Sequence, residues 1–184
     1  MKKKIPLILK IILIHILFIV LHFMYDFVPG GITAIFCGIN ESIYQHMKIG
    51  FFAYILFAII EYGLTKKTIP EFIQFIFPRL FSAAFLPLIM IVFYYVGPLF
   101  FGRIESVFLD VLFANVVLMA TSFTTLVVEE QIERSSISKL FKFVTVVIFI
   151  LSLIQFIMFT FKLPWLDLFE DPSCISAANL LLGK

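Results

Sequence analysis

The chain has little charge, two cysteines and a single tryptophan. Only 14% of its 184 residues are charged, whereas soluble domains average about 25%. Apolar residues make up 62%, so too few polar residues remain to cover a surface that faces water. This composition excludes a soluble enzyme, a disordered chain and a nucleic-acid-binding domain. The sequence therefore predicts an integral membrane protein whose main partner is the lipid bilayer.

The cysteines, Cys37 and Cys174, form neither a CxxC redox motif nor a zinc-binding cluster. A disulfide between them and two free thiols are both left open. The basic start of the chain, followed by an apolar run, is typical of a signal peptide. That run exceeds the ~7–15 residues of a signal-peptide core, and no small-x-small cleavage site follows it. We expect it to be retained as a first span.

Charged residues divide the chain into apolar segments that are long enough to cross a membrane. A helix needs ~20 residues to cross a hydrocarbon layer of ~30 Å. We expect one transmembrane domain that covers residues 1–184 and ends in a tail over 162–184. Lys10 interrupts the first span, and its long side chain is expected to extend back toward the N-terminal lysines. The predicted spans cover approximately residues 5–26, 47–64, 79–98, 106–128 and 142–161.

The segment 27–40 is uncharged but is broken by a Pro-Gly-Gly sequence and is too short to cross the membrane. Irregular backbone is not tolerated in contact with lipid, so this segment is either interfacial or re-entrant and packed within protein. Asn40 is a good helix cap, and we expect a helix to begin near it and continue into the second span. The predicted fold is an all-α integral membrane bundle of five spans, with a short interfacial or re-entrant helix between spans 1 and 2.

The positions of the basic residues predict an orientation. If the five spans alternate, ten of the 14 basic residues fall on the side of the N-terminus. Segments rich in Lys and Arg stay on the cytoplasmic side. We therefore expect a cytoplasmic (inner) N-terminus and an extracytoplasmic (outer) C-terminus. Homo- and hetero-oligomers are both left open.

Seven ionisable side chains lie within or beside the predicted spans, where such groups cost roughly 2.5–3.5 kcal/mol each on insertion scales. Each therefore needs a partner or a role. His15, His22 and Asp26 are spaced i, i+7 and i+11, which places them on one stripe of a helix. The seven residues are His15, His22, Asp26, Glu41, His46, Glu61 and Asp110.

Five of these side chains are predicted to lie at a similar depth near the outer surface. Asp26 is about 24 Å beyond Lys10 along a helix, and His22 lies one turn deeper. Glu41 and His46 precede the second span on the same side, and Asp110 lies about two turns into the fourth span. The sequence therefore predicts that four separate segments bring these groups into one pocket.

Two imidazoles and three carboxylates are suitable ligands for a divalent metal such as Zn²⁺. In this hypothesis His22, His46 and Asp110 bind the metal, and Glu41 or Asp26 acts as general base. The predicted function is a metal-dependent hydrolase or transferase that acts on a lipid-like substrate at the outer leaflet. No HExxH motif fixes the geometry. On a regular helix Glu41 and His46 would point about 140° apart, so they can share a ligand only across a distortion or through a bridging group in the second shell.

Several alternatives remain open. The carboxylate–imidazole groups could only hold helices together, or the chain could be a small-solute-binding or transport subunit, a structural partner in a membrane complex, or a protein with a pH-linked role. Glu61 is expected to form a solvated ion pair with Lys66 and Lys67. His15, Asn115 and Gln155 are expected to make polar contacts between helices. In the tail, Trp165 is expected to anchor at the interface, while Asp167, Glu170 and Asp171 could cover the outer cluster.

Residues 40–48, Asn-Glu-Ser-Ile-Tyr-Gln-His-Met-Lys, carry a family resemblance. They resemble the Asn-Glu-Ser-(Val/Ile)-Trp-(Glu/Gln)-His-Leu-Lys signature of a family of small bacterial membrane proteins classified only as a domain of unknown function. Two further stretches look similar, His22-Phe-Met-Tyr-Asp26 and Leu168-Phe-Glu-Asp-Pro172. This chain differs at Tyr44, where the family usually has Trp, and at Gln45, where Glu is more common. The resemblance implies a polytopic protein of the bacterial plasma membrane and names no reaction.

Overall fold

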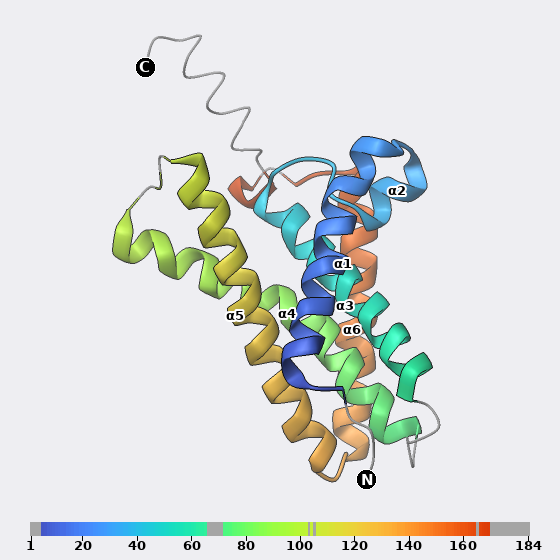
Figure 1. Cartoon of the computed structure of the whole chain (residues 1–184). Coiled ribbons are helices and arrows are strands. Elements are labelled where there is room, and N and C mark those ends of the chain that lie inside the picture. The colour runs from blue at the N-terminus through green and yellow to red at the C-terminus, as the bar shows by residue number, and fades with distance from the viewer. Residues whose placement is uncertain (1–4, 66–71, 103, 105, 165, 170–184) are drawn as a thin grey trace, which may run out of the picture.

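The structure is a computed structural model that describes residues 5–65, 72–102, 104, 106–164 and 166–169. Five of its helices are long and apolar enough to cross a membrane. No strand occurs in the described residues, and a short helix lies between the first two long ones, so the predicted all-α five-span fold is confirmed (Figure 1). The elements are α1 (Leu7–Phe27), α2 (Gly31–Phe36), α3 (Ile43–Thr65), α4 (Phe72–Phe101), α5 (Val107–Arg134), α6 (Lys139–Phe161) and the 3₁₀ helix η2 (Asp167–Phe169).

Two of the long helices extend well beyond the predicted spans. The span predicted over 79–98 lies inside α4, and the span predicted over 106–128 lies inside α5. Arg79 and Glu129, which marked span boundaries in the sequence, lie within these helices and are 3% and 1% exposed. They are tolerated there because they form an ion pair with each other.

Helix α3 lies at the centre of the bundle and packs against α1 and α4. Its contact with α6 is aromatic, because the ring of Phe51 lies 5.5 Å from that of Phe149 and 5.0 Å from that of Phe156. The end of the bundle that carries α2 is called the α2 end, and the opposite end, where α1 begins, is called the N-terminal end (Figure 1).

Helices α4 and α5 pack along each other, and α4 contains three prolines, Pro78, Pro87 and Pro98. A proline inside a helix removes a backbone hydrogen bond and favours a kink. In Figure 1 the C-terminal part of α4 and the start of α5 extend to the left, away from the α2 end of α1 and α3. The first turns of α5 are therefore separated from the other helix ends.

The start of α3 differs from the prediction. The helix begins at Ile43, and its first turn is capped by Ser42, whose Oγ accepts a hydrogen bond of 3.3 Å from the backbone N–H of Gln45. Asn40 lies outside the helix, where its side chain accepts a bond of 3.0 Å from the N–H of Ser42. Residues 40–42 therefore form a turn, which releases Glu41 from helical geometry.

Lys48 attaches α2 to the rest of the bundle. Its side chain is fully buried in α3, and Nζ donates to the carbonyl oxygen of Ala34 at 2.7 Å and to Oγ1 of Thr160 at 3.2 Å. The bond to Ala34 satisfies a carbonyl at the C-terminal end of α2, where a cation is favourable. The short helix therefore packs against α3 and α6.

Cys37, which follows α2, is 2% exposed, and burial raises the pKa of its thiol. Cys174 lies outside the described residues. Only the thiolate reacts with maleimide, and a raised pKa lowers the thiolate fraction at neutral pH. We expect Cys37 in a Cys174→Ser variant to react at least tenfold more slowly at pH 7.5 than the same chain in denaturant, with the rate rising toward pH 9.5. Equal rates in the two states would contradict the burial of Cys37.

Candidate metal centre

His22, Glu41 and His46 meet at the α2 end of the bundle. His22 comes from α1, Glu41 from the turn before α3, and His46 from the first turns of α3. Nε2 of His22 lies 3.4 Å from Oε1 of Glu41, and Nε2 of His46 lies 3.6 Å from Oε2 of the same carboxylate. One ligand atom from each residue lies within 4.8 Å of the others. The carboxylate of Glu41 is therefore shared by the two imidazoles.

The local hydrogen bonds orient His46 for ligand binding. Its Nδ1 lies 2.9 Å from the backbone carbonyl oxygen of Ser42. A carbonyl can only accept, so Nδ1 carries a proton, and in the neutral ring the lone pair for a metal is then on Nε2, which faces Glu41. Histidine ligands of metals commonly have this second contact. The ring of Phe18 stacks on both imidazoles, at 6.3 Å from His22 and 6.2 Å from His46, and restricts their orientation.

The turn that carries Glu41 is held close to α1. The N–H of Gly38 donates to the carbonyl oxygen of Leu21 at 3.4 Å. A Cβ at Gly38 would lie 2.8 Å from Cδ1 of Ile49, which is fully buried in α3, so the turn packs closely against α3 at this glycine. The divergence of about 140° between Glu41 and His46 applies only to a regular helix. Glu41 precedes the first residue of α3, and this break in the helix lets its carboxylate approach His46.

The ligand set and its spacing suit Zn²⁺. Zinc binds nitrogen and carboxylate oxygen at ~2.0–2.2 Å, so tetrahedral ligands lie about 3.3–3.6 Å apart. The imidazole–carboxylate distances, 3.4 Å to one oxygen of Glu41 and 3.6 Å to the other, are close to this separation, and one ligand atom from each residue lies within 4.8 Å of the others. Two histidines and one glutamate leave a fourth position open, as in catalytic zinc sites. The side chain of Glu41 is 59% exposed, so the site is accessible from outside the bundle.

The other two residues of the predicted pocket lie outside this three-residue group. Asp26 is one helical turn beyond His22 on α1 and acts on it electrostatically. Asp110 lies in the first turn of α5 and acts electrostatically on Tyr94 of α4. The start of α5 extends away from the α2 end of α1, so Asp110 belongs to the α4–α5 side of the molecule (Figure 1).

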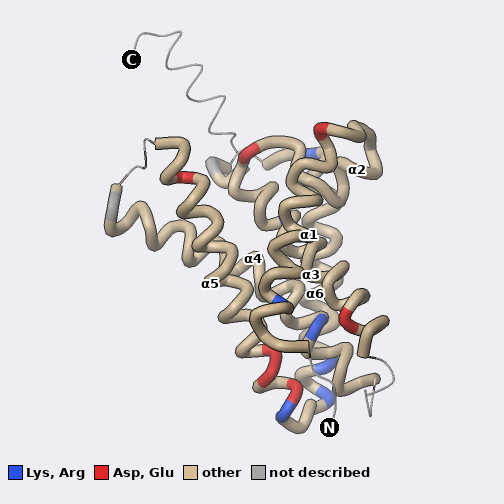
Figure 2. Tube along the Cα trace, viewed as in Figure 1, with Lys and Arg blue, Asp and Glu red and all other residues tan. Residues whose placement is uncertain are grey.

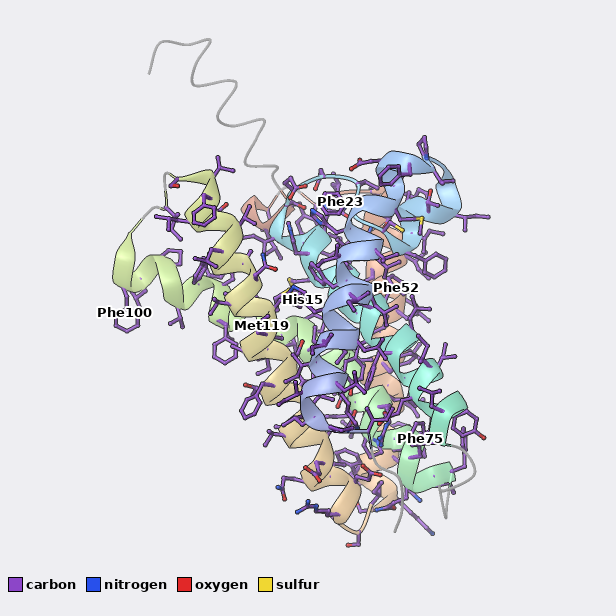
Figure 3. All side chains as sticks on the ribbon, in the orientation of Figure 1. His15, Phe23, Phe52, Phe75, Phe100 and Met119 are labelled. Carbon is purple, nitrogen blue, oxygen red and sulfur yellow. The ribbon has the colours of Figure 1, made fainter. Side chains whose placement is uncertain are left out.

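His15 and Asn115 were each predicted to make a polar contact between helices, and the structure shows that they are each other's partner. Nε2 of His15 lies 2.9 Å from Oδ1 of Asn115, which joins α1 to α5 in the middle of the bundle. Figure 3 shows His15 on the side of α1 that is turned toward α5. Gln155 contributes through its backbone, because its carbonyl oxygen accepts a bond of 3.0 Å from the hydroxyl of Tyr44.

The prediction of a solvated Glu61 is wrong. Glu61 is 3% exposed, and its carboxylate pairs with Lys10 at 2.5 Å and with Nε of Arg79 at 3.1 Å. Lys10 is therefore directed toward Glu61. Lys66 and Lys67 lie outside the described residues. A buried carboxylate needs compensating charge, and α1 and α4 supply it.

These residues belong to a larger group that the sequence reasoning missed, here called the ionic network. Arg79 also lies 3.6 Å from Glu129 and 3.4 Å from Glu133, while Lys10 lies 3.8 Å from Glu129. The hydroxyl of Tyr54 donates to Glu129. Charged residues gather at the N-terminal end in Figure 2. The network consists of Lys10, Tyr54, Glu61, Arg79, Glu129 and Glu133.

Regular spacing in the sequence contains a signal for this network. Glu129 and Glu133 are four residues apart, and Tyr54 and Glu61 are seven apart, so each pair shares one helix face. A charged face that continues into a long apolar segment indicates that the charges are paired inside the bundle. This spacing is missed when charged residues are used only to mark the ends of the spans.

The tail contacts the α2 end through η2. The ring of Phe169 is buried and lies 4.3 Å from that of Tyr44 and 5.5 Å from that of Phe159. Trp165, Glu170 and Asp171 lie outside the described residues, as does the side chain of Asp167.

Comparison with known proteins gives a match to one sequence family. Residues 1–176 match a family of unknown function, DUF6512. No curated protein and no solved structure matches the chain.

Proposed function

The chain belongs to this family of unknown function, so we infer its function from the geometry of the site. We propose that the protein is a membrane-embedded, divalent-metal-dependent hydrolase or transferase. The proposal depends on one observation, the convergence of His22, Glu41 and His46 with ligand atoms within 4.8 Å of one another. Its substrate is a lipid-like ester near the membrane surface, because the site lies close to the end of α1 and the start of α3, two helices that are long and apolar enough to cross a membrane.

In this proposal Glu41 has a different role from the one expected from the sequence. Its two oxygens face the two imidazoles, so it acts as the third ligand in place of Asp110. Asp26, one turn beyond His22, is then the general base. A bound Zn²⁺ would lower the pKa of its water toward ~7 and polarise the ester. Asp26 accepts the proton of the attacking water or alcohol and returns it to the departing oxygen.

The same proposal includes an orientation. The excess of basic residues near the N-terminal end favours a cytoplasmic N-terminus, which puts the metal centre at the outer leaflet and the C-terminus outside. The signature over residues 40–48 favours a bacterial plasma membrane as the location. A reporter enzyme fused to each terminus tests this topology, because only an extracytoplasmic fusion of a periplasm-dependent reporter is active.

Metal analysis of the purified protein is the direct test. After incubation with Zn²⁺ and desalting, we expect about one zinc per chain in the unmodified protein, because three ligands converge. His46→Ala removes a ligand and should lose stoichiometric zinc. Asp110→Asn is the matched control and should retain it, because Asp110 lies outside the three-residue group.

Two results would overturn the proposal. One is the absence of stoichiometric metal in the unmodified protein. The other is equal zinc in the unmodified protein and in His46→Ala. Activity is then measured on vesicles that contain phosphate-ester or carboxylic-ester lipids, with and without a chelator. Hydrolysis should stop in chelator, return with added Zn²⁺, and be lost in Asp26→Asn while that variant keeps its zinc.

A further inference from the structure

A row of polar side chains follows one face of α5 through the bundle. Asn115, Ser122, Thr125 and Glu129 fall within about 40° of a common direction at ~100° per residue. The row covers about 21 Å along the helix axis at ~1.5 Å per residue, which is most of a ~30 Å hydrocarbon layer. Helix α5 therefore has a nearly continuous row of polar side chains on a face where apolar side chains would pack better against the other helices.

The hydroxyls in the middle of this row are buried and unsatisfied. Ser122 is 1% exposed and Thr125 is fully buried, and neither hydroxyl has a hydrogen-bond partner in the described part of the chain. In membrane helices such hydroxyls usually bond to a carbonyl one turn back or to another helix. Buried polar atoms without a protein partner are the positions at which internal water binds.

At the N-terminal end, the row joins the ionic network. Glu129 accepts from Tyr54, and the hydroxyl of Ser82 lies beside that of Tyr54. Glu133, one turn beyond Glu129, has a side chain that is 28% exposed and gives access to water. The charged groups that act on Glu129 are Lys10 from α1, Glu61 from α3 and Arg79 from α4, and Arg79 also pairs with Glu133 of α5.

In the middle of the bundle, the row ends at the pair formed by His15 and Asn115. Both residues are partly exposed, because the start of α5 diverges from α1 beyond this contact (Figure 1). Nδ1 of His15 is buried and has no partner within the described residues. His15 therefore has one nitrogen bonded to Asn115 and one that is available to a water molecule.

A single apolar residue interrupts the row. Leu118 is 4% exposed and lies on the same face as Asn115 and Ser122, which are about 10 Å apart along the helix. A short apolar gap between two polar segments slows the passage of water and protons.

We propose that the polar face of α5 is a proton pathway, which connects the ionic network to the His15–Asn115 pair, with Leu118 as its barrier. Water bound at Ser122 and Thr125 relays the proton, and each oxygen accepts one proton as it releases another. Each transfer forms one O–H or N–H bond as it breaks another, so no bond is permanently made or broken between the ionic network and the His15–Asn115 pair. Carboxylates, histidines and hydroxyls at membrane depth are the side chains that proton relays use.

Proton flux into vesicles tests this pathway. The full chain is reconstituted into liposomes that contain a pH-sensitive dye, and a potassium gradient with valinomycin supplies the driving voltage. We expect faster acidification than in protein-free liposomes. Thr125→Val should slow it at least fivefold, whereas Thr124→Val, the same change at a position about 140° from the centre of the row, should leave it unchanged. Thr125→Val breaks no hydrogen bond within the described residues, so the variant should fold normally.

Two further pairs, each of a variant and its control, test the end of the proton pathway at Glu129 and its barrier at Leu118. Glu129→Gln should abolish flux, while Glu130→Gln, at the adjacent position with a side chain that is 43% exposed, should not. Leu118→Ser should raise flux at least fivefold, whereas Val117→Ser, equally buried but about 100° away, should not. Flux equal to that of protein-free liposomes, or equal losses in Thr125→Val and Thr124→Val, would overturn the proposal. The metal centre is outside this path, so zinc content stays unchanged in every one of these variants.

Discussion

Arg79→Met is expected to lower the free energy of unfolding by about 3–5 kcal/mol, the usual cost of removing one partner from a buried ion pair. Arg79 contacts three carboxylates, and two of them, Glu61 and Glu129, are less than 5% exposed. Without the guanidinium, Lys10 is the one cation left in the network as the structure describes it. Such a loss lowers the melting temperature by roughly 10 °C for a domain of this size. Thermal unfolding in detergent measures it.

Arg134→Met is the matched control. Arg134 also pairs with a carboxylate, that of Glu130 at 2.7 Å, but its side chain is 63% exposed. Surface pairs of this kind contribute about 0–1 kcal/mol, so this variant should unfold close to the temperature of the unmodified protein. Equal effects of the two substitutions would show that the ionic network is solvated and does not stabilise the bundle.

The fold was largely predictable because the membrane limits the choices. The hydrocarbon layer requires helices of about 20 apolar residues, and apolar runs of that length are visible in the sequence. The boundaries were less accurate where charge was paired inside the bundle. Arg79 and Glu129 resemble interfacial residues in the sequence, and only tertiary contacts reveal that each compensates the other.

The candidate metal centre was partly predictable. Depth along the spans identified His22, Glu41 and His46, and helical spacing placed His22 on one stripe with His15 and Asp26. The roles depended on a local detail, since capping by Ser42 instead of Asn40 moves Glu41 out of the helix. Asp110 was assigned to the pocket by depth alone. Depth does not determine position around the bundle axis, and α5 begins away from α1.

Gly97→Ala is expected to destabilise the bundle by about 1–3 kcal/mol, the usual cost of overpacking. Gly97 is the point where α4 meets the ring of Phe113 on α5. A Cβ at Gly97 would lie 2.1 Å from Cζ and 2.4 Å from Cε2 of that ring. The ring also packs on Tyr94, with centroids 6.0 Å apart, which limits its escape. The helices of the diverging α4–α5 pair would have to separate to admit one methyl group.

The same substitution at a second glycine should have the opposite sign. Gly63 lies in α3, and no atom of the described residues comes within 4 Å of the position that a Cβ would occupy there. Gly63→Ala should therefore stabilise by about 0.5–1 kcal/mol through helix propensity alone. Adding Phe113→Leu to Gly97→Ala should recover most of the lost stability, because the shorter side chain makes room for the methyl group. Chemical unfolding of these variants and the unmodified protein measures this coupling. Additive effects of Gly97→Ala and Phe113→Leu would show that the two helices do not meet at this contact.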